Sequence, residues 1–224
     1  MNEKNLINEA RQSVVEAGLA LVHSAMTVGT YGNISCRIDE EHIAITPSGR
    51  NYEQLTAADI VVTDRDGEKT EGELLPSSEL ALHLEIYKSF PEAQAIVHTH
   101  SIYASALAAS HKDLPPIIED LTQIVGGTVR CTEYTLAGTK QLGRNAVEAM
   151  EGGRNAALLA NHGAVCWGRN MKEALVTAHI LEKGAQIYCI ARSFGAPFPL
   201  DEKTVRTLHD FYINHYSKRQ QGEE

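Results

Sequence analysis

Apolar side chains recur at helical spacing over two long segments of the chain. In residues 3–24 they are Leu6, Ala10, Val14, Ala17 and Leu21. In residues 171–193 they repeat at steps of four and three: Ala174, Ala178, Leu181, Ala185 and Tyr188. Each segment is therefore predicted to be an amphipathic helix. Shorter helices are predicted at 76–90, 101–110, 139–150 and 201–217.

Short apolar runs between these helices predict strands. They lie at 33–38, 42–46, 93–100 and 155–160, and 126–135 is expected to be extended. Residues 59–72 predict a hairpin, because the Asp66-Gly67 dipeptide favours a tight turn. Helices flanking a sheet indicate an α/β layered fold, and the hairpins favour a largely antiparallel or mixed sheet. With no linker or repeat in view, we expect one domain over 1–224.

Composition narrows the class of protein. The chain has 224 residues and a formal net charge of −9, without a basic block that could neutralise a nucleic-acid backbone. No apolar run approaches the roughly 20 residues of a membrane span, and the polar first residues do not form a secretory signal. The cysteines are widely spaced, which favours small apolar fillers in a reduced cytoplasmic protein. Nucleic acid and membrane are therefore not expected partners.

His98 and His100 stand out in the run Ala95–Ser101, "AIVHTHS". Residues two apart on a strand point to the same face, so these two imidazoles can reach one metal ion. His162, in "LLANHGAV", follows another buried strand and is the best third ligand; Gly163 beside it lets backbone or substrate approach closely. Three neutral imidazoles leave a zinc-type ion charged and with an open position, which is the catalytic arrangement.

Three turns combine small polar side chains with glycine or a helix start. Glu79 lies in the first turn of the helix that Ser77 or Ser78 can cap. A helix start of this kind suits a phosphate, and the turns "GTYGN" (29–33) and "TPSG" (46–49) can also form anion-binding nests. Each is equally compatible with an ordinary turn, and no P-loop pattern is present.

Together, the ordered elements "GTYGNIS", "TPSG", "PSSE", "HTHS" and "NHG" resemble the class II aldolase/adducin family, and most closely its L-fuculose-1-phosphate aldolase branch. The resemblance spans nearly the whole chain. It implies a three-layer α/β/α sandwich and a zinc-dependent enzyme acting on a small phosphorylated sugar. It also implies a fourfold homotetramer with active sites between neighbouring subunits.

Site roles follow from the same resemblance, position by position. His98, His100 and His162 would bind Zn²⁺ or another divalent metal. Glu79 would be the acid/base residue and would join the ligands when substrate is absent. The implied phosphate cradle is Asn33, Ser48, Gly49, Ser77 and Ser78. The implied reaction cleaves a ketose 1-phosphate, such as L-fuculose 1-phosphate, to dihydroxyacetone phosphate and an aldehyde.

The chain departs from the family pattern in one loop. Fuculose-phosphate aldolases have a tyrosine shortly before a Gly-Gly pair, where "IIEDLTQIVGG" places Glu119 and Asp120. An aspartate in this loop is typical of the related L-ribulose-5-phosphate 4-epimerases, so Asp120 is a candidate catalytic residue. A tyrosine expected near the C-terminus is Tyr212 or Tyr216, and Tyr212 is taken first.

Four readings therefore remain open on this scaffold: aldolase, 4-epimerase, and phosphoketose dehydratase or decarboxylase. A more remote alternative is a non-catalytic adducin-like module that binds a protein partner. A binding module does not require three histidines and Glu79 at the positions of the family's metal site. The sequence therefore favours an enzyme, and within that class an aldolase.

Overall fold

A seven-stranded sheet in the order β4-β3-β2-β1-β5-β7-β6 forms the centre of the computed structural model, which describes residues 3–221. The strands are β1 (Asn33–Arg37), β2 (His42–Ile45), β3 (Val61–Asp64), β4 (Lys69–Glu71), β5 (Ala95–Thr99), β6 (Ala156–Leu159) and β7 (Gly163–Gly168). Every neighbouring pair is antiparallel. The predicted strands and the hairpin at Asp66-Gly67 are confirmed, and the sheet is antiparallel throughout rather than mixed.

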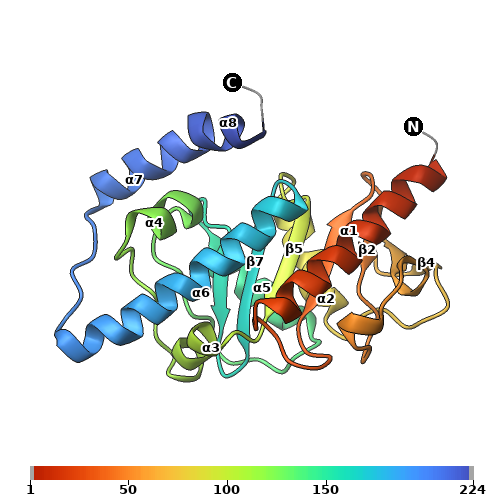
Figure 1. The fold of residues 1–224 in the computed structure, drawn as a ribbon, viewed down its shortest axis with the longest axis horizontal. Helices are drawn as coiled ribbons and strands as arrows, with labels where there is room; N and C mark the ends of the chain where they lie inside the picture. Colours follow the sequence, from red (N-terminus) through yellow and green to blue (C-terminus); the bar gives the residue numbers. More distant parts are fainter. Residues whose placement is uncertain (1–2, 222–224) are drawn as a thin grey trace.

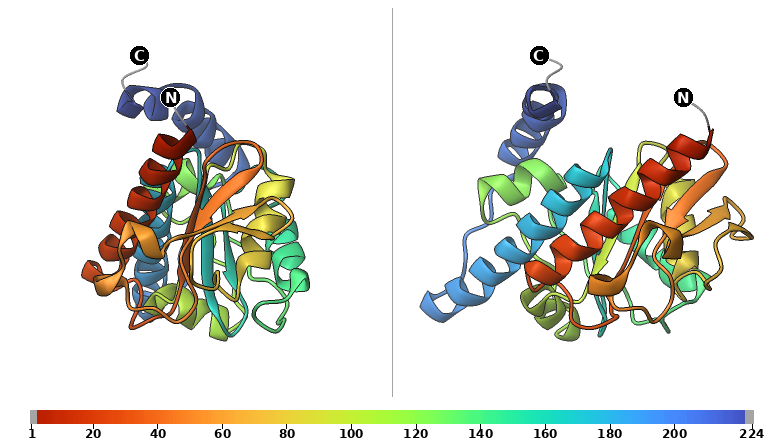
Figure 2. Two further views of the ribbon diagram at one scale, coloured as in Figure 1. Left: turned by 90° about the vertical axis from the view of Figure 1, so that its right-hand side faces the viewer. Right: turned by 45° about the vertical axis from the view of Figure 1, so that its right-hand side comes forward.

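Helices cover both faces of this sheet (Figures 1 and 2). They are α1 (Glu3–His23), α2 (Leu80–Ser89), α3 (Ile102–Ala109), α4 (Glu119–Val125), α5 (Lys140–Met150), α6 (Met171–Phe194), α7 (Glu202–Phe211) and α8 (Ser217–Gln221). The edge-on view in Figure 2 places α1 and α6 on one side and α2 and α5 on the other. The α/β/α sandwich implied by the resemblance is confirmed.

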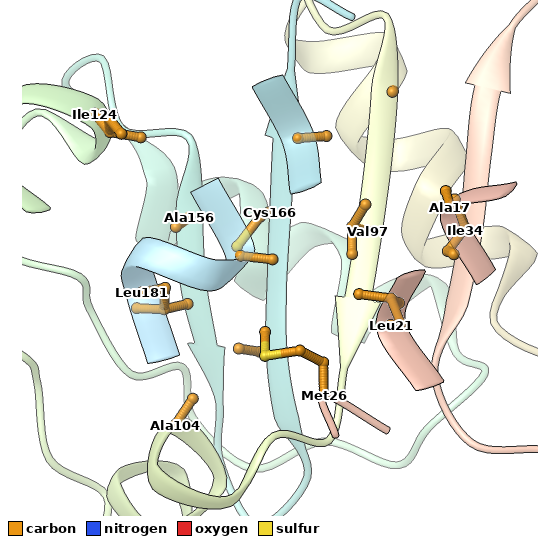
Figure 3. Packing of buried hydrophobic residues seen from close by; sticks show 14 of the residues in the cluster. Ala17, Leu21, Met26, Ile34, Val97, Ala104, Ile124, Ala156, Cys166 and Leu181 are labelled. Atoms are coloured by element: carbon orange, nitrogen blue, oxygen red, sulfur yellow. The ribbon is translucent and has the colours of Figure 1, made fainter. Parts of the chain in front are cut away.

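Alternation along the strands builds a separate core on each face. Figure 3 shows the first core, where Leu21 of α1 packs near Val97, and Leu181 of α6 lies near Cys166. The opposite core joins Ile96 of β5 to Leu82 of α2. Because residues 96 and 98 share a face, the side chain of His98 is directed toward the layer that holds α2 and α5.

Three segments differ from the sequence-based expectation. Strand β7, which follows the predicted strand at 155–160, has no counterpart among the predicted strands. The predicted loop "IIEDLTQIVGG" (117–127) contains the helix α4, which ends at Gly126 in the left-handed conformation (φ 84°). The expected helix at 201–217 is interrupted by a π-helical segment, Tyr212–Tyr216, between α7 and α8. The segment 126–135, expected to be extended, begins with the left-handed Gly126 and contains isolated β-bridges at Val129 and Cys131 but no regular strand. Among the described residues, no helix is long and apolar enough to cross a membrane.

Candidate metal centre and active site

The three predicted histidine ligands meet at one end of the central strands. His98 is the fourth residue of β5 and is fully buried, while His100 follows the strand. Their Nε2 atoms lie 3.0 Å apart. The ring of His162 lies 4.7 Å from that of His98 and 4.9 Å from that of His100, measured between centroids. One nitrogen from each ring lies within 4.8 Å of the others, which groups them as a candidate metal site.

The turn between β6 and β7 places His162 in this group. Asn161 adopts a left-handed conformation (φ 55°), and the backbone N–H of His162 donates to the carbonyl of Leu159 over 2.9 Å. Gly163 then lies so close to β5 that a Cβ atom there would approach the Thr99 carbonyl oxygen to 2.3 Å. A side chain at 163 would therefore push the turn, and His162 with it, away from β5.

Glu79 completes the arrangement from the start of α2. Its Oε2 lies 3.1 Å from Nε2 of His98, and its Oε1 lies 3.4 Å from Nε2 of His162. Burial by itself would raise the pKa of Glu79, but His98, His162 and a hydrogen bond from Asn33 together hold that pKa well below its usual value. The carboxylate is therefore ionised at neutral pH.

These residues fit a divalent metal ion. The Nδ1–H of His98 donates to the Ala164 carbonyl over 2.9 Å, which leaves its Nε2 lone pair directed at the cluster. Burial lowers the pKa of His100 to about 3 and that of His162 to about 4, so both rings are neutral ligands. Within the part of the chain that the structure describes, Glu79 Oε1 and His162 Nδ1 are buried without a hydrogen-bond partner. Three imidazoles and a carboxylate form a donor set suited to zinc.

The three predicted anion-binding turns are also neighbours. The backbone N–H of Ser77 donates to the Thr46 carbonyl over 3.0 Å, and Pro47 and Pro76 form an antiparallel bridge. The hydroxyl of Thr46 accepts from the N–H of Ile34 over 3.2 Å, which ties "TPSG" to the end of "GTYGN". The fold therefore gathers these turns beside the start of α2.

Members of the predicted phosphate cradle differ in exposure. Ser48, Gly49 and Ser78 are exposed, and Ser77 is buried with its hydroxyl accepting from the Glu79 N–H over 3.2 Å. Helix α2 begins at Leu80, so Glu79 occupies the N-cap position rather than the first turn. Asn33 is buried, and its side-chain amide donates to Glu79 over 2.8 Å.

The candidate residues Asp120, Tyr212 and Tyr216 do not contact the histidine cluster in the pairs described for the single chain; each has other neighbours. Asp120, at the start of α4, forms an ion pair with Lys183 of α6. Tyr212 is buried, and its hydroxyl donates to Glu173 over 3.2 Å, whereas Tyr216 is largely exposed. The catalytic roles predicted for Asp120 and Tyr212 involve a site shared between subunits, so they stay predictions.

Sequence reasoning missed a residue next to the site. A single histidine in a helix is typical of a surface or core position, so the sequence assigns His83 no role. In the structure it is fully buried, and its Nε2 lies 2.6 Å from Oδ1 of Asn33. A signal was present: Glu79 and His83 are four residues apart and therefore share one face of the helix.

The fold and the site define the class of protein. Residues 12–189 match the model of the Class II Aldolase and Adducin N-terminal domain, and the chain belongs to this family. Its relatives are named aldolases, and the chain is an aldehyde-lyase of class II.

Individual relatives place the chain among sugar-phosphate aldolases. It is 41% identical to the 5-deoxy-D-ribulose 1-phosphate aldolase of Bacillus thuringiensis serovar kurstaki, over 91% of this chain and 95% of that protein. It is 32% identical to the L-fuculose phosphate aldolase of Escherichia coli K12, over 91% and 94%. A solved L-fuculose 1-phosphate aldolase is 38% identical and superposes with a TM-score of 0.88, over 92% of this chain and 96% of that one.

Proposed function

We propose that this chain is a zinc-dependent aldolase that cleaves a ketose 1-phosphate to dihydroxyacetone phosphate and an aldehyde. L-Fuculose 1-phosphate and 5-deoxy-D-ribulose 1-phosphate are the leading substrates, because similar proteins are named for them. Three imidazoles and the Glu79 carboxylate, converging beside three anion-binding turns, carry this proposal.

Retro-aldol cleavage leaves negative charge on the three-carbon product as an enediolate. His98, His100 and His162 would hold a divalent ion, which would supply positive charge to stabilise this developing negative charge. Glu79 is ionised and adjacent to the ligands, so its Oε1 can accept a proton from the substrate and return it to the enediolate carbon. No lysine is needed to form a Schiff base in this scheme.

The phosphate is assigned to the turns that carry Ser48, Gly49, Ser77 and Ser78. Hydroxyls and backbone N–H groups at a helix start bind anions without a cluster of basic side chains, which suits the acidic composition. Binding there holds the substrate at a point distant from the bond that breaks, and so orients it. Asn33 joins this cradle only if its amide turns away from Glu79.

Assembly and location are part of the same proposal. The family resemblance implies a homotetramer in the cytoplasm whose sites receive Asp120 or Tyr212 from a neighbouring subunit. Residues 1–224 are proposed to act as one class II aldolase domain.

A coupled assay tests the reaction. The zinc-loaded protein is incubated with each of the two ketose 1-phosphates, and with L-ribulose 5-phosphate for comparison. A dehydrogenase that reduces dihydroxyacetone phosphate reports cleavage through loss of NADH. We expect triose phosphate from a ketose 1-phosphate. An epimer, or a dehydrated or decarboxylated product, without any triose phosphate would reject the aldolase assignment.

A further inference from the structure

A continuous line of buried hydrogen bonds runs from Glu79 into the layer between β1 and α2. The amide of Asn33 donates to Oε2 of Glu79 over 2.8 Å, and its Oδ1 lies 2.6 Å from Nε2 of His83. On the other side of the ring, Nδ1 lies 2.6 Å from the hydroxyl of Ser35. That hydroxyl lies 2.8 Å from the hydroxyl of Tyr87. All five side chains belong to buried residues.

Helix and strand geometry explain why these contacts form a ladder. Glu79, His83 and Tyr87 are spaced by four residues along α2, and Asn33 and Ser35 by two along β1. Four helical residues advance about 6 Å and two strand residues about 6.8 Å, so the two series stay in step. The strand side chains therefore alternate with the helix side chains from the site into the core.

The contacts of Asn33 fix the direction of the hydrogen bonds. Its NH₂ group donates to Oε2 of Glu79, so its Oδ1, which only accepts, faces His83. Nε2 of His83 must then carry a proton, and Nδ1 must accept from Ser35. Complete burial, reinforced by His98, lowers the pKa of His83 to about 3, in agreement with a neutral ring.

We propose that His83 is a positioning residue, which holds Asn33 so that its amide fixes Oε2 of Glu79 and leaves Oε1 directed at the metal site. Asn33 sets the tautomer of His83, and the hydroxyls of Ser35 and Tyr87, which can donate or accept, complete the chain. The catalytic consequence rests on the proposed aldolase function, whereas the tautomer of His83 does not. Oε1 is the carboxylate oxygen without a hydrogen-bond partner, so the ladder anchors one oxygen and keeps the other available.

Two amide variants separate the proposed role from general packing. In His83→Gln the side-chain NH₂ reaches the position of Nε2 and still donates to Asn33. In His83→Asn the shorter amide corresponds to Nδ1 and leaves Asn33 without its donor. We expect His83→Asn to lower kcat about 10–100-fold, the usual range for residues that orient metal-site ligands, with a smaller change in KM. His83→Gln should recover most of that loss.

Ile86→Val, on the same helix and without a side-chain hydrogen bond in the ladder, controls for loss of stability in α2. It removes one buried methyl group, and its kcat should equal that of the unaltered protein. Equal losses of kcat in His83→Gln, His83→Asn and Ile86→Val would overturn the positioning role and indicate a packing effect.

Nitrogen-15 NMR of histidine-labelled, zinc-loaded protein provides a readout independent of activity. We expect the His83 ring, assigned by its disappearance in His83→Gln, to be neutral with its proton on Nε2. A proton on Nδ1, or a charged ring at neutral pH, would overturn the ladder even in an active enzyme. If neither ketose 1-phosphate is cleaved, the proposed aldolase function fails. The NMR result for His83 then still tests the proposed direction of the hydrogen bonds in the ladder.

Discussion

Two buried glutamates in this molecule have opposite surroundings. Glu173, on α6, accepts from the guanidinium of Arg169 through several contacts between 2.6 and 3.2 Å, from the Arg169 backbone N–H over 2.7 Å, and from Tyr212 over 3.2 Å. Glu79 accepts a hydrogen bond from Asn33 and otherwise faces the imidazoles of His98 and His162, and its Oε1 has no hydrogen-bond partner among the described residues. Both residues are under 9% exposed.

The carboxylate of Glu173 is fully paired within the protein, whereas the carboxylate of Glu79 is not. A buried carboxylate is tolerated when opposite charge and hydrogen bonds compensate its desolvation, as at Glu173. Around Glu79 the protein places imidazole ligands instead, and a bound cation would supply the opposite charge. Stability should therefore depend on the first glutamate, and catalysis on the second.

The largest expected effect follows from removing a histidine of the cluster. His162→Ala should lose tightly bound zinc, because two imidazoles and a carboxylate form a weaker site than three imidazoles and a carboxylate. Cleavage of ketose 1-phosphates should then fall to background. Zinc content by mass spectrometry and the coupled assay measure both, and full activity with normal zinc content would exclude His162 from the site.

Glu79→Gln should lower kcat by about 10²–10⁴-fold while zinc stays bound, because the amide cannot accept and return a proton. The coupled assay gives kcat, and metal analysis on the same sample shows whether the ion is retained. Unchanged turnover would remove Glu79 from the mechanism.

Glu173→Gln should act on stability instead. It leaves the partly exposed Arg169 without its carboxylate, and we expect the free energy of unfolding to fall by about 1–3 kcal/mol. The zinc content should remain that of the unaltered protein. Urea unfolding followed by circular dichroism measures the change, and loss of zinc without loss of stability would reverse the comparison between the two glutamates.

The smallest expected effect is the pH dependence of that stability. Hydrogen bonds and the charge of Arg169 hold the pKa of Glu173 below its usual value, although burial opposes them. A carboxyl with a depressed pKa in the folded state stabilises the protein above its unfolded pKa, about 4.3, and this contribution is lost as pH falls through the folded value. The stability gap between the unaltered protein and Glu173→Gln should therefore narrow below about pH 4. A constant gap would contradict this.

Sequence patterns predicted strands β1 to β6, the long helices and the three histidines because each depends on local periodicity or on residues two apart, but they did not predict β7. They did not predict α4, which begins without a side-chain cap, or the π-helical segment at Tyr212–Tyr216, whose backbone follows no simple repeat. The ladder through His83 required the pairing of β1 with α2, which no single segment encodes. The spacing of four between Glu79, His83 and Tyr87 in "ELALHLEIY" indicates that they share one helix face, but it does not identify their partners on β1.

Metal stoichiometry tests the central claim most directly. The protein is stripped with a chelator, titrated with zinc by calorimetry, and compared with His162→Ala and Glu173→Gln. We predict one zinc ion per chain for the unaltered protein and for Glu173→Gln, and loss of tight binding in His162→Ala. Absence of zinc binding in the unaltered protein, together with no gain of activity from any divalent ion, would contradict the assignment of this histidine cluster as a metal centre.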